Sequence, residues 1–102
     1  MKLGFMPYDP QTRFQALREM ALAAEDAGFA SLWLPDHFFH RFEGQEELGF
    51  WEVFTFLSAL AAVTSRITLG PLVACTSFRN PALLAKIADA LDEVSDGRFI
   101  LG

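Results

Sequence analysis

The chain has 102 residues, of which 52% are hydrophobic and 11 are phenylalanine. A formal net charge of −5, without any run of lysine or arginine, argues against a general affinity for nucleic acid or anionic membranes. So much apolar material predicts elements that are buried on more than one side, which a domain of this size achieves with difficulty. We therefore expect these residues to be part of a larger unit.

The cellular context is indicated by cysteine usage and by the apolar runs. A single cysteine, Cys75, excludes an internal disulfide and favours a reducing compartment. The apolar run after Lys2 stops at Pro7, which is not typical of a signal peptide. The most apolar later stretch, residues 50–63, is too short to span a bilayer. We expect a soluble, cytoplasmic protein.

The first third of the chain predicts a strand, a helix and a second strand. Residues 2–6 predict the first strand, and Asp9 with Pro10 suits the N-cap and first position of a helix. Gly28 stands where a glycine commonly ends a helix. Residues 30–34 predict the second strand, nearly all apolar, as is typical of a strand covered on both faces. The apolar face of the helix consists of Phe14, Leu17, Met20, Ala21 and Ala24.

The middle of the chain predicts a long loop, a second helix and a third strand. The loop is expected from Asp36 to about Gly49, and the strand over residues 67–74, with an interruption at Gly70 and Pro71. Six residues at helical spacing mark the helix. They are Trp51, Phe54, Leu57, Ser58, Ala61 and Ala62.

The last third of the chain predicts a third helix and the beginning of a fourth strand. Asn80 followed by Pro81 repeats the signal for a helix start, and Asp96 with Gly97 ends the helical pattern. Residues 98–101 then predict a strand. The helical stripe consists of Leu83, Leu84, Ile87, Ala88 and Leu91.

The order β-α-β-α-β-α-β predicts an α/β fold with a parallel sheet. Two architectures fit: a small doubly wound domain, or the first half of a (β/α)8 TIM barrel that is incomplete in this chain. No glycine-rich turn follows the first or second strand, which weakens the nucleotide-binding doubly wound alternative. The barrel is therefore favoured.

Polar and aromatic side chains follow each predicted strand, and in βα units such residues converge on one face. His37 is suited to general acid/base chemistry, although a loop histidine that only hydrogen-bonds is the alternative. Asp36 suits a ligand contact or a cap equally well. We expect no metal site, because His40 and Glu43 lie in a loop without further ligands. Cys75 has no basic neighbour, which argues against a nucleophilic role.

Three segments of the chain together resemble the N-terminal part of the luciferase-like monooxygenase family. They are GFASLWLPDHF, LAAVTSRITLGPLV and FRNPALLAKIADALDEVSDGRFILG, and the resemblance extends over almost the whole chain. The resemblance implies a (β/α)8 barrel, with residues 1–102 forming the N-terminal part of a single domain that stops at the fourth strand. It also implies coenzyme F420 or reduced FMN, bound at the carboxyl rim of the strands.

The resemblance implies roles for individual residues. Asp36 would lie near the polar edge of the ring system, and His37 would be the acid/base group at its reacting face. Leu72 and Val73 would be joined by a non-prolyl cis peptide that supports the ring. Backbone groups near Cys75 and Thr76 would border the cofactor.

The same resemblance bears on the choice of cofactor. The sequence Asp36-His37-Phe38 favours the F420 branch, because FMN-type members often have Glu-His-His there. Some sugar-phosphate and alcohol dehydrogenases of that branch carry tryptophan four residues after the histidine, where this chain has Arg41. Because of this departure, the resemblance does not support a sugar phosphate or an alcohol as the substrate.

The expected function is an oxidoreductase that moves a hydride to or from a small organic substrate with F420. The alternatives are a reduced-FMN monooxygenase and a non-catalytic half-barrel that self-associates. An open half-barrel leaves its first and fourth strands as unpaired edges, which invite pairing with another chain. Family members also pair through the helices after strands two and three, so a homodimer or higher self-association is expected.

Overall fold

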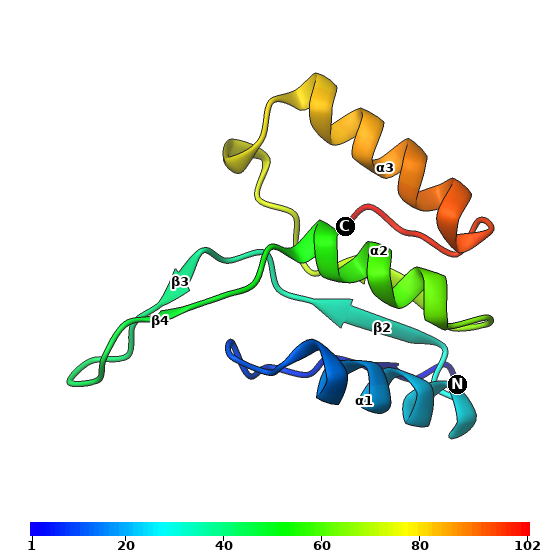
Figure 1. The fold of residues 1–102 in the computed structure, drawn as a ribbon, viewed down its shortest axis with the longest axis horizontal. Coiled ribbons are helices and arrows are strands. Elements are labelled where there is room, and N and C mark those ends of the chain that lie inside the picture. The colour runs from blue at the N-terminus through cyan, green and yellow to red at the C-terminus, as the bar shows by residue number, and fades with distance from the viewer.

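A computed structural model describes residues 1–102, in which a small parallel sheet is packed against three α-helices (Figure 1). The elements are β1 (Gly4–Phe5), α1 (Phe14–Asp26), β2 (Ser31–Leu34), β3 (Phe39–His40), β4 (Leu48–Gly49), α2 (Val53–Val63), β5 (Thr68–Pro71), the 3-10 helix η1 (Thr76–Phe78) and α3 (Pro81–Ser95). The main sheet has the order β1-β2-β5, and both pairings are parallel. The predicted α/β order with parallel strands is confirmed.

The fourth strand is represented by one parallel bridge between Leu69 and Phe99. The Leu69 N–H donates to Arg98 O (2.9 Å), and the Ile100 N–H donates to Leu69 O (2.9 Å). Residues 98–101 therefore lie beside β5, as predicted, but they form a shorter pairing than expected. The third strand is also shorter than predicted, because only residues 68–71 form β5.

The helices cover one face of the sheet. Leu32 and Leu34 of β2 point to this face, as alternation along a strand requires. Leu69 of β5 lies opposite Leu32 in the register and joins the same core. The buried core consists of Leu17, Ala21, Ala24, Leu32, Leu34, Val53, Phe54, Leu57, Leu60, Ala61, Ile67, Leu69 and Leu91. The predicted apolar face of α1 is confirmed, and Phe14 and Met20 pack at its margin.

Trp33 occupies the opposite face of the sheet. Its indole N–H donates to Ser31 Oγ (2.8 Å), and its ring lies against the backbone of Gly4 and Gly70 in the neighbouring strands. A Cβ at either glycine would collide with the indole or its hydrogen-bond partner. Glycine at these positions therefore makes room for the tryptophan between β1 and β5.

The helix start predicted at Asp9 and Pro10 is wrong. Helix α1 begins at Phe14, and its N-cap residue, Arg13, makes no side-chain capping bond. Asp9 instead closes a turn, with its side chain accepting from the Gln11 N–H (3.1 Å). An Asp-Pro pair starts turns as readily as helices, because the aspartate side chain can accept from its own backbone two residues on.

The loop predicted from Asp36 to Gly49 contains a hairpin, in which β3 and β4 pair antiparallel. The hairpin projects from the body of the molecule (Figure 1). Trp51 was expected on the second helix but precedes it, and its indole donates to Thr12 O (3.1 Å). Strands of two residues, such as β3 and β4, are too short to show a period, so the sequence pattern did not predict the hairpin.

Helix α3 begins and ends as predicted. The Asn80 side chain accepts from the Ala82 N–H (2.9 Å), and Pro81 occupies the first turn. Asp96 adopts the left-handed conformation with φ 56°, which ends the helix before Gly97. Of its predicted stripe, only Leu91 is fully buried. No helix of the chain is long and apolar enough to cross a membrane.

The amino end of the sheet is closed by polar contacts around β5. The Glu25 carboxylate accepts from the N–H groups of Ser65 (3.0 Å), Arg66 (2.6 Å) and Ile67 (2.8 Å). Beside it, the Arg98 guanidinium donates to the carbonyl oxygens of Ala61, Thr64 and Ile67. These contacts join α1, the end of α2 and residues 98–101 around the start of β5.

Candidate active site

The carboxyl ends of β2 and β5 bring two predicted site segments together. Asp36 follows β2 and is buried, and its Oδ2 accepts from the Cys75 N–H (2.8 Å) in the segment after β5. The Leu72 N–H donates to Leu34 O (2.8 Å), which extends the parallel pairing by one bond. Parallel strands that end together thus place these segments at one edge of the sheet.

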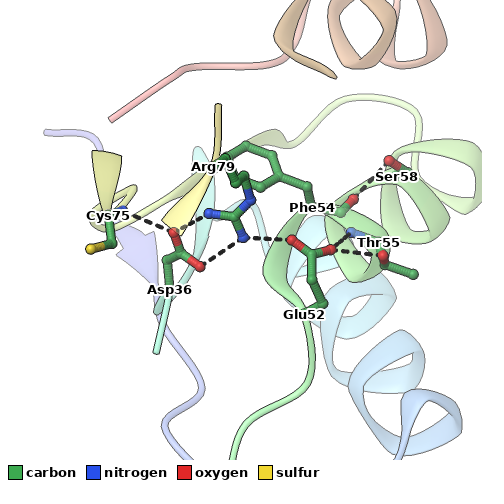
Figure 2. Close-up of polar contacts among 7 residues, drawn as sticks. All are labelled: Asp36, Glu52, Phe54, Thr55, Ser58, Cys75 and Arg79. Atoms are coloured by element: carbon green, nitrogen blue, oxygen red, sulfur yellow. Dashed lines mark hydrogen bonds and ion pairs between the residues drawn. The ribbon is translucent and has the colours of Figure 1, made fainter. Parts of the chain in front are cut away.

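Arg79 binds the Asp36 carboxylate in a bidentate ion pair. Its Nη1 donates to Asp36 Oδ2 (2.6 Å) and its Nη2 donates to Asp36 Oδ1 (2.9 Å). The side chains are 9% and 2% exposed, respectively. Figure 2 shows the guanidinium lying between Asp36 and a second carboxylate, that of Glu52. Buried charges persist where they are paired in this way.

Glu52 connects this ion pair to the start of α2. Its Oε1 accepts from Arg79 Nη2 (2.5 Å), while its Oε2 accepts from the backbone N–H (2.6 Å) and the hydroxyl (2.7 Å) of Thr55. Glu52 is the N-cap residue of α2. The Arg79 guanidinium carbon also lies 4.4 Å from the centre of the Phe54 ring, within the range of a cation–π contact. We call Asp36, Glu52, Phe54 and Arg79 the arginine cluster.

The charged forms of Arg79 and Glu52 are stabilised within the arginine cluster. Hydrogen bonds that Arg79 donates to the carboxylates of Asp36 and Glu52 raise the pKa of Arg79 despite its burial. Burial alone would raise the pKa of Glu52, but hydrogen bonds from Thr55 and Arg79 outweigh it and lower the pKa. The cluster therefore holds one guanidinium between two carboxylates.

His37 lies on the exposed side of this edge. It makes no side-chain hydrogen bond, and its ring centre is 5.3 Å from that of Phe50 and 6.4 Å from that of His40. His40 is placed by the Tyr8 hydroxyl, which lies 3.1 Å from its Nδ1. An imidazole free of partners and open to solvent is available to exchange a proton with a bound molecule.

The remaining predicted site residues are also accessible. The peptide between Leu72 and Val73 is cis, as the resemblance implied. These two side chains are 47% and 61% exposed. Cys75 is half-buried, and the exposed Thr76 begins η1. The structure thus brings Asp36 and Cys75 into direct contact and leaves His37, Leu72, Val73 and Thr76 open at the same edge. Their roles toward a cofactor stay predictions.

Sequence reasoning missed the arginine cluster. Asp36 and Arg79 are 43 positions apart, and no spacing rule links them. The available signal was indirect: a carboxylate directly after a buried strand needs a cation or several N–H donors. The Asp36 carboxylate is bound by Arg79 and the Cys75 amide, and its contact with a ligand stays a prediction.

Comparisons with known proteins agree with this fold. Two curated relatives match over the full length of the chain. The 5,10-methylenetetrahydromethanopterin reductase of Archaeoglobus fulgidus is 33% identical, and the chain covers 27% of it. The F420-dependent glucose-6-phosphate dehydrogenase of Amycolatopsis mediterranei is 35% identical, and the chain covers 30% of it. The chain thus spans less than a third of the length of these relatives.

One solved structure extends the similarity to three dimensions. An F420-dependent secondary alcohol dehydrogenase, in complex with an F420–acetone adduct, is 26% identical with a TM-score of 0.83. The match covers 98% of this chain and 30% of that one. The family model described as luciferase-like monooxygenase matches residues 2–102. The chain belongs to the luciferase-like monooxygenase family.

Proposed function

We propose that the protein carrying this chain is an oxidoreductase that moves a hydride between coenzyme F420 and a small organic substrate. The carrying observation is the exposed His37 at the carboxyl ends of parallel strands, beside a buried, paired Asp36. F420 is part of the names of several similar proteins, which supports this cofactor over others. The departure at Arg41 leaves the substrate itself unnamed.

The residues at this edge fit a flat, partly polar ring system. Leu72 and Val73 offer exposed apolar surface, while the Thr76 hydroxyl and the Cys75 backbone offer polar groups beside it. When bound, the cofactor supplies the hydride chemistry. His37 moves the accompanying proton, and the apolar side chains exclude water. Asp36, with its carboxylate bound by Arg79, would lie near the polar edge of the ring.

The proposal is tested on the protein in its natural length by titration with F420 and with FMN, followed by turnover assays. His37→Asn is expected to lower kcat by about 10²- to 10⁴-fold with little change in stability. His40→Asn, three residues further along in the hairpin, is the matched control and should lower kcat far less. Tight FMN binding without F420 binding would overturn the choice of cofactor, and unchanged kcat in His37→Asn would overturn the role of His37.

A reduced-FMN monooxygenase is the second candidate. It is favoured by the description of the matching family, which is that of luciferase-like monooxygenases. His37 would again move a proton, now during reaction with oxygen. Oxygen uptake that depends on reduced FMN and on substrate separates this candidate from the first, because hydride transfer with F420 consumes no oxygen.

The isolated chain of 102 residues is a separate case. We propose that its fold is the first half of a (β/α)8 barrel, so that β1 and residues 98–101 present open edges. The chain alone should then self-associate and be catalytically inert. Sedimentation that shows a folded monomer, together with turnover, would contradict both expectations.

A further inference from the structure

We infer that Arg79 is a positioning residue, which holds the segment bearing His37 in place against the segment bearing Cys75 and Thr76. This inference rests on the proposed function for its consequence in catalysis, but the positioning itself is independent of any cofactor. Arg79 lies in the third segment that resembles the family, but no role in the site was predicted for it. The assignment comes from the arginine cluster alone.

The arginine cluster joins three segments that are distant in the chain. Asp36 directly precedes His37 at the end of β2, and Glu52 caps α2. Arg79 follows η1 and contacts both carboxylates. Asp36 in turn accepts from the Cys75 N–H, so the guanidinium secures that contact as well. Loss of the arginine would release three loops at once.

Arginine suits this task in a way that lysine does not. The planar guanidinium presents two N–H groups to Asp36 and shares one of its nitrogens with Glu52. The Phe54 ring lies 4.4 Å from the guanidinium carbon and favours its position there. An ammonium group at this place keeps the charge but loses the two-pronged geometry. Arg79→Lys therefore tests whether the geometry of the guanidinium, and not only its positive charge, is needed.

The chain offers a matched control at the other end of the sheet. Arg98 is also half-buried, and its guanidinium donates to Thr64 Oγ1 and to three carbonyl oxygens. These bonds close the amino end of the strands, away from His37. Arg98→Lys should lower the stability of the fold without displacing the site residues. Arg79→Lys should lower the stability and also displace the site residues.

The first experiment needs no cofactor. The natural-length protein and the variants Arg79→Lys and Arg98→Lys are exposed to a thiol reagent under conditions in which circular dichroism shows them folded. Mass spectrometry then follows labelling of the Cys75 peptide, and hydrogen exchange follows its amide. We expect both rates to rise about tenfold or more in Arg79→Lys and to stay within about twofold in Arg98→Lys. Unchanged rates in Arg79→Lys, or equal rises in both variants, would overturn the inference.

The second experiment reads out catalysis. Because small displacements of reacting groups cost up to about 10²-fold in rate, Arg79→Lys should lower kcat at least about tenfold while KM stays within about threefold. Arg98→Lys should retain kcat. Absence of turnover in the unaltered protein would reject the proposed function but leave the labelling result to decide the inference. Full kcat in a folded Arg79→Lys would overturn it.

A milder variant, Glu52→Gln, tests the inference if Arg79→Lys does not fold. Glu52→Gln keeps an oxygen for the Thr55 N–H but weakens the ionic contact with Arg79. It should raise the labelling rate of Cys75 by an intermediate factor, between the unaltered protein and Arg79→Lys. If Arg79→Lys does not fold, an unaltered labelling rate in Glu52→Gln overturns the inference and a raised rate supports it.

Discussion

Two carboxylates are buried at opposite ends of the same parallel sheet, and they are stabilised in different ways. Glu25 lies at the amino end and is 8% exposed, while Asp36 lies at the carboxyl end and is 5% exposed. Glu25 is satisfied by three successive backbone N–H groups and the Ser65 hydroxyl. Asp36 is satisfied chiefly by the side chain of Arg79.

The difference shows what each end of the sheet is built to do. Contacts to Glu25 come from residues 65–67, one short stretch that leads directly into β5. Contacts to Asp36 come from the Arg79 side chain and the Cys75 amide, and Arg79 is in turn bound by Glu52, so that three segments have to lie in one arrangement. The first kind of contact stabilises the fold, and the second also sets the relative position of loops. In βα folds those loops carry the chemistry, whereas the amino end contributes stability.

The largest expected change in the free energy of unfolding is that caused by Arg79→Ala. It leaves the Asp36 carboxylate buried without its cation, and breaking a buried ion pair in this way costs about 3–5 kcal/mol. Urea unfolding at neutral pH measures the change in the free energy of unfolding. A loss below about 1 kcal/mol would show that the Cys75 amide alone satisfies Asp36, and the contrast between the two ends of the sheet would disappear.

Glu25→Ala tests the amino end directly. The N–H groups of Ser65, Arg66 and Ile67 lose their acceptor, but the first two residues are exposed and water replaces the carboxylate there. Only the Ile67 N–H stays buried, so the expected loss is about 2–3 kcal/mol, smaller than for Arg79→Ala. The same unfolding assay measures it. A loss equal to that of Arg79→Ala would contradict the ranking of the two ends.

Acid titration tests the contribution of Glu25 at the amino end of the sheet. Burial would raise the pKa of Glu25, but backbone hydrogen bonds from Ile67, Arg66 and Ser65 outweigh it and lower the pKa from 4.5 to about 2. A lowered pKa stabilises the folded state above pH 4.5, and this contribution is lost as the pH falls toward 2.

We expect the Glu25 part of this loss to be about 2 kcal/mol, because nearby water weakens the full effect of the pKa difference. Unfolding measured at several pH values in the unaltered chain and in Glu25→Gln gives the Glu25 part by difference. Parallel pH profiles for the two proteins would contradict the assignment.

The smallest effect is expected for Arg66→Ala. Arg66 pairs with Asp26 at 3.6 Å, and both side chains are largely exposed. Such pairs contribute about 0–1 kcal/mol, and salt screens them further. The change in the free energy of unfolding should therefore stay under about 0.5 kcal/mol and vanish at high salt. A larger loss would show that the side-chain bond from Arg66 to Glu25 O strengthens the amino end.

Local signals in the sequence predicted much of the fold. The Asn80-Pro81 start of α3 and its end at Asp96 are confirmed, because caps depend on residues that are close in the chain. The apolar face of α1 was predictable from its period. The hairpin after β2 and the turn at Asp9 were not, because short pairings and Asp-Pro turns leave no distinctive pattern.

The sequence by itself determined the order of the helices and parallel strands and the placement of His37 after a strand. These follow from periodicity and from residues that are neighbours in the chain, whereas the family was indicated by the resemblance of three segments. Only the tertiary structure decided how Asp36 is satisfied, because its cation comes from Arg79, 43 positions away, and its amide donor comes from Cys75. Charge pairing acts through space in a buried environment, and a linear pattern carries no record of which side chains meet there.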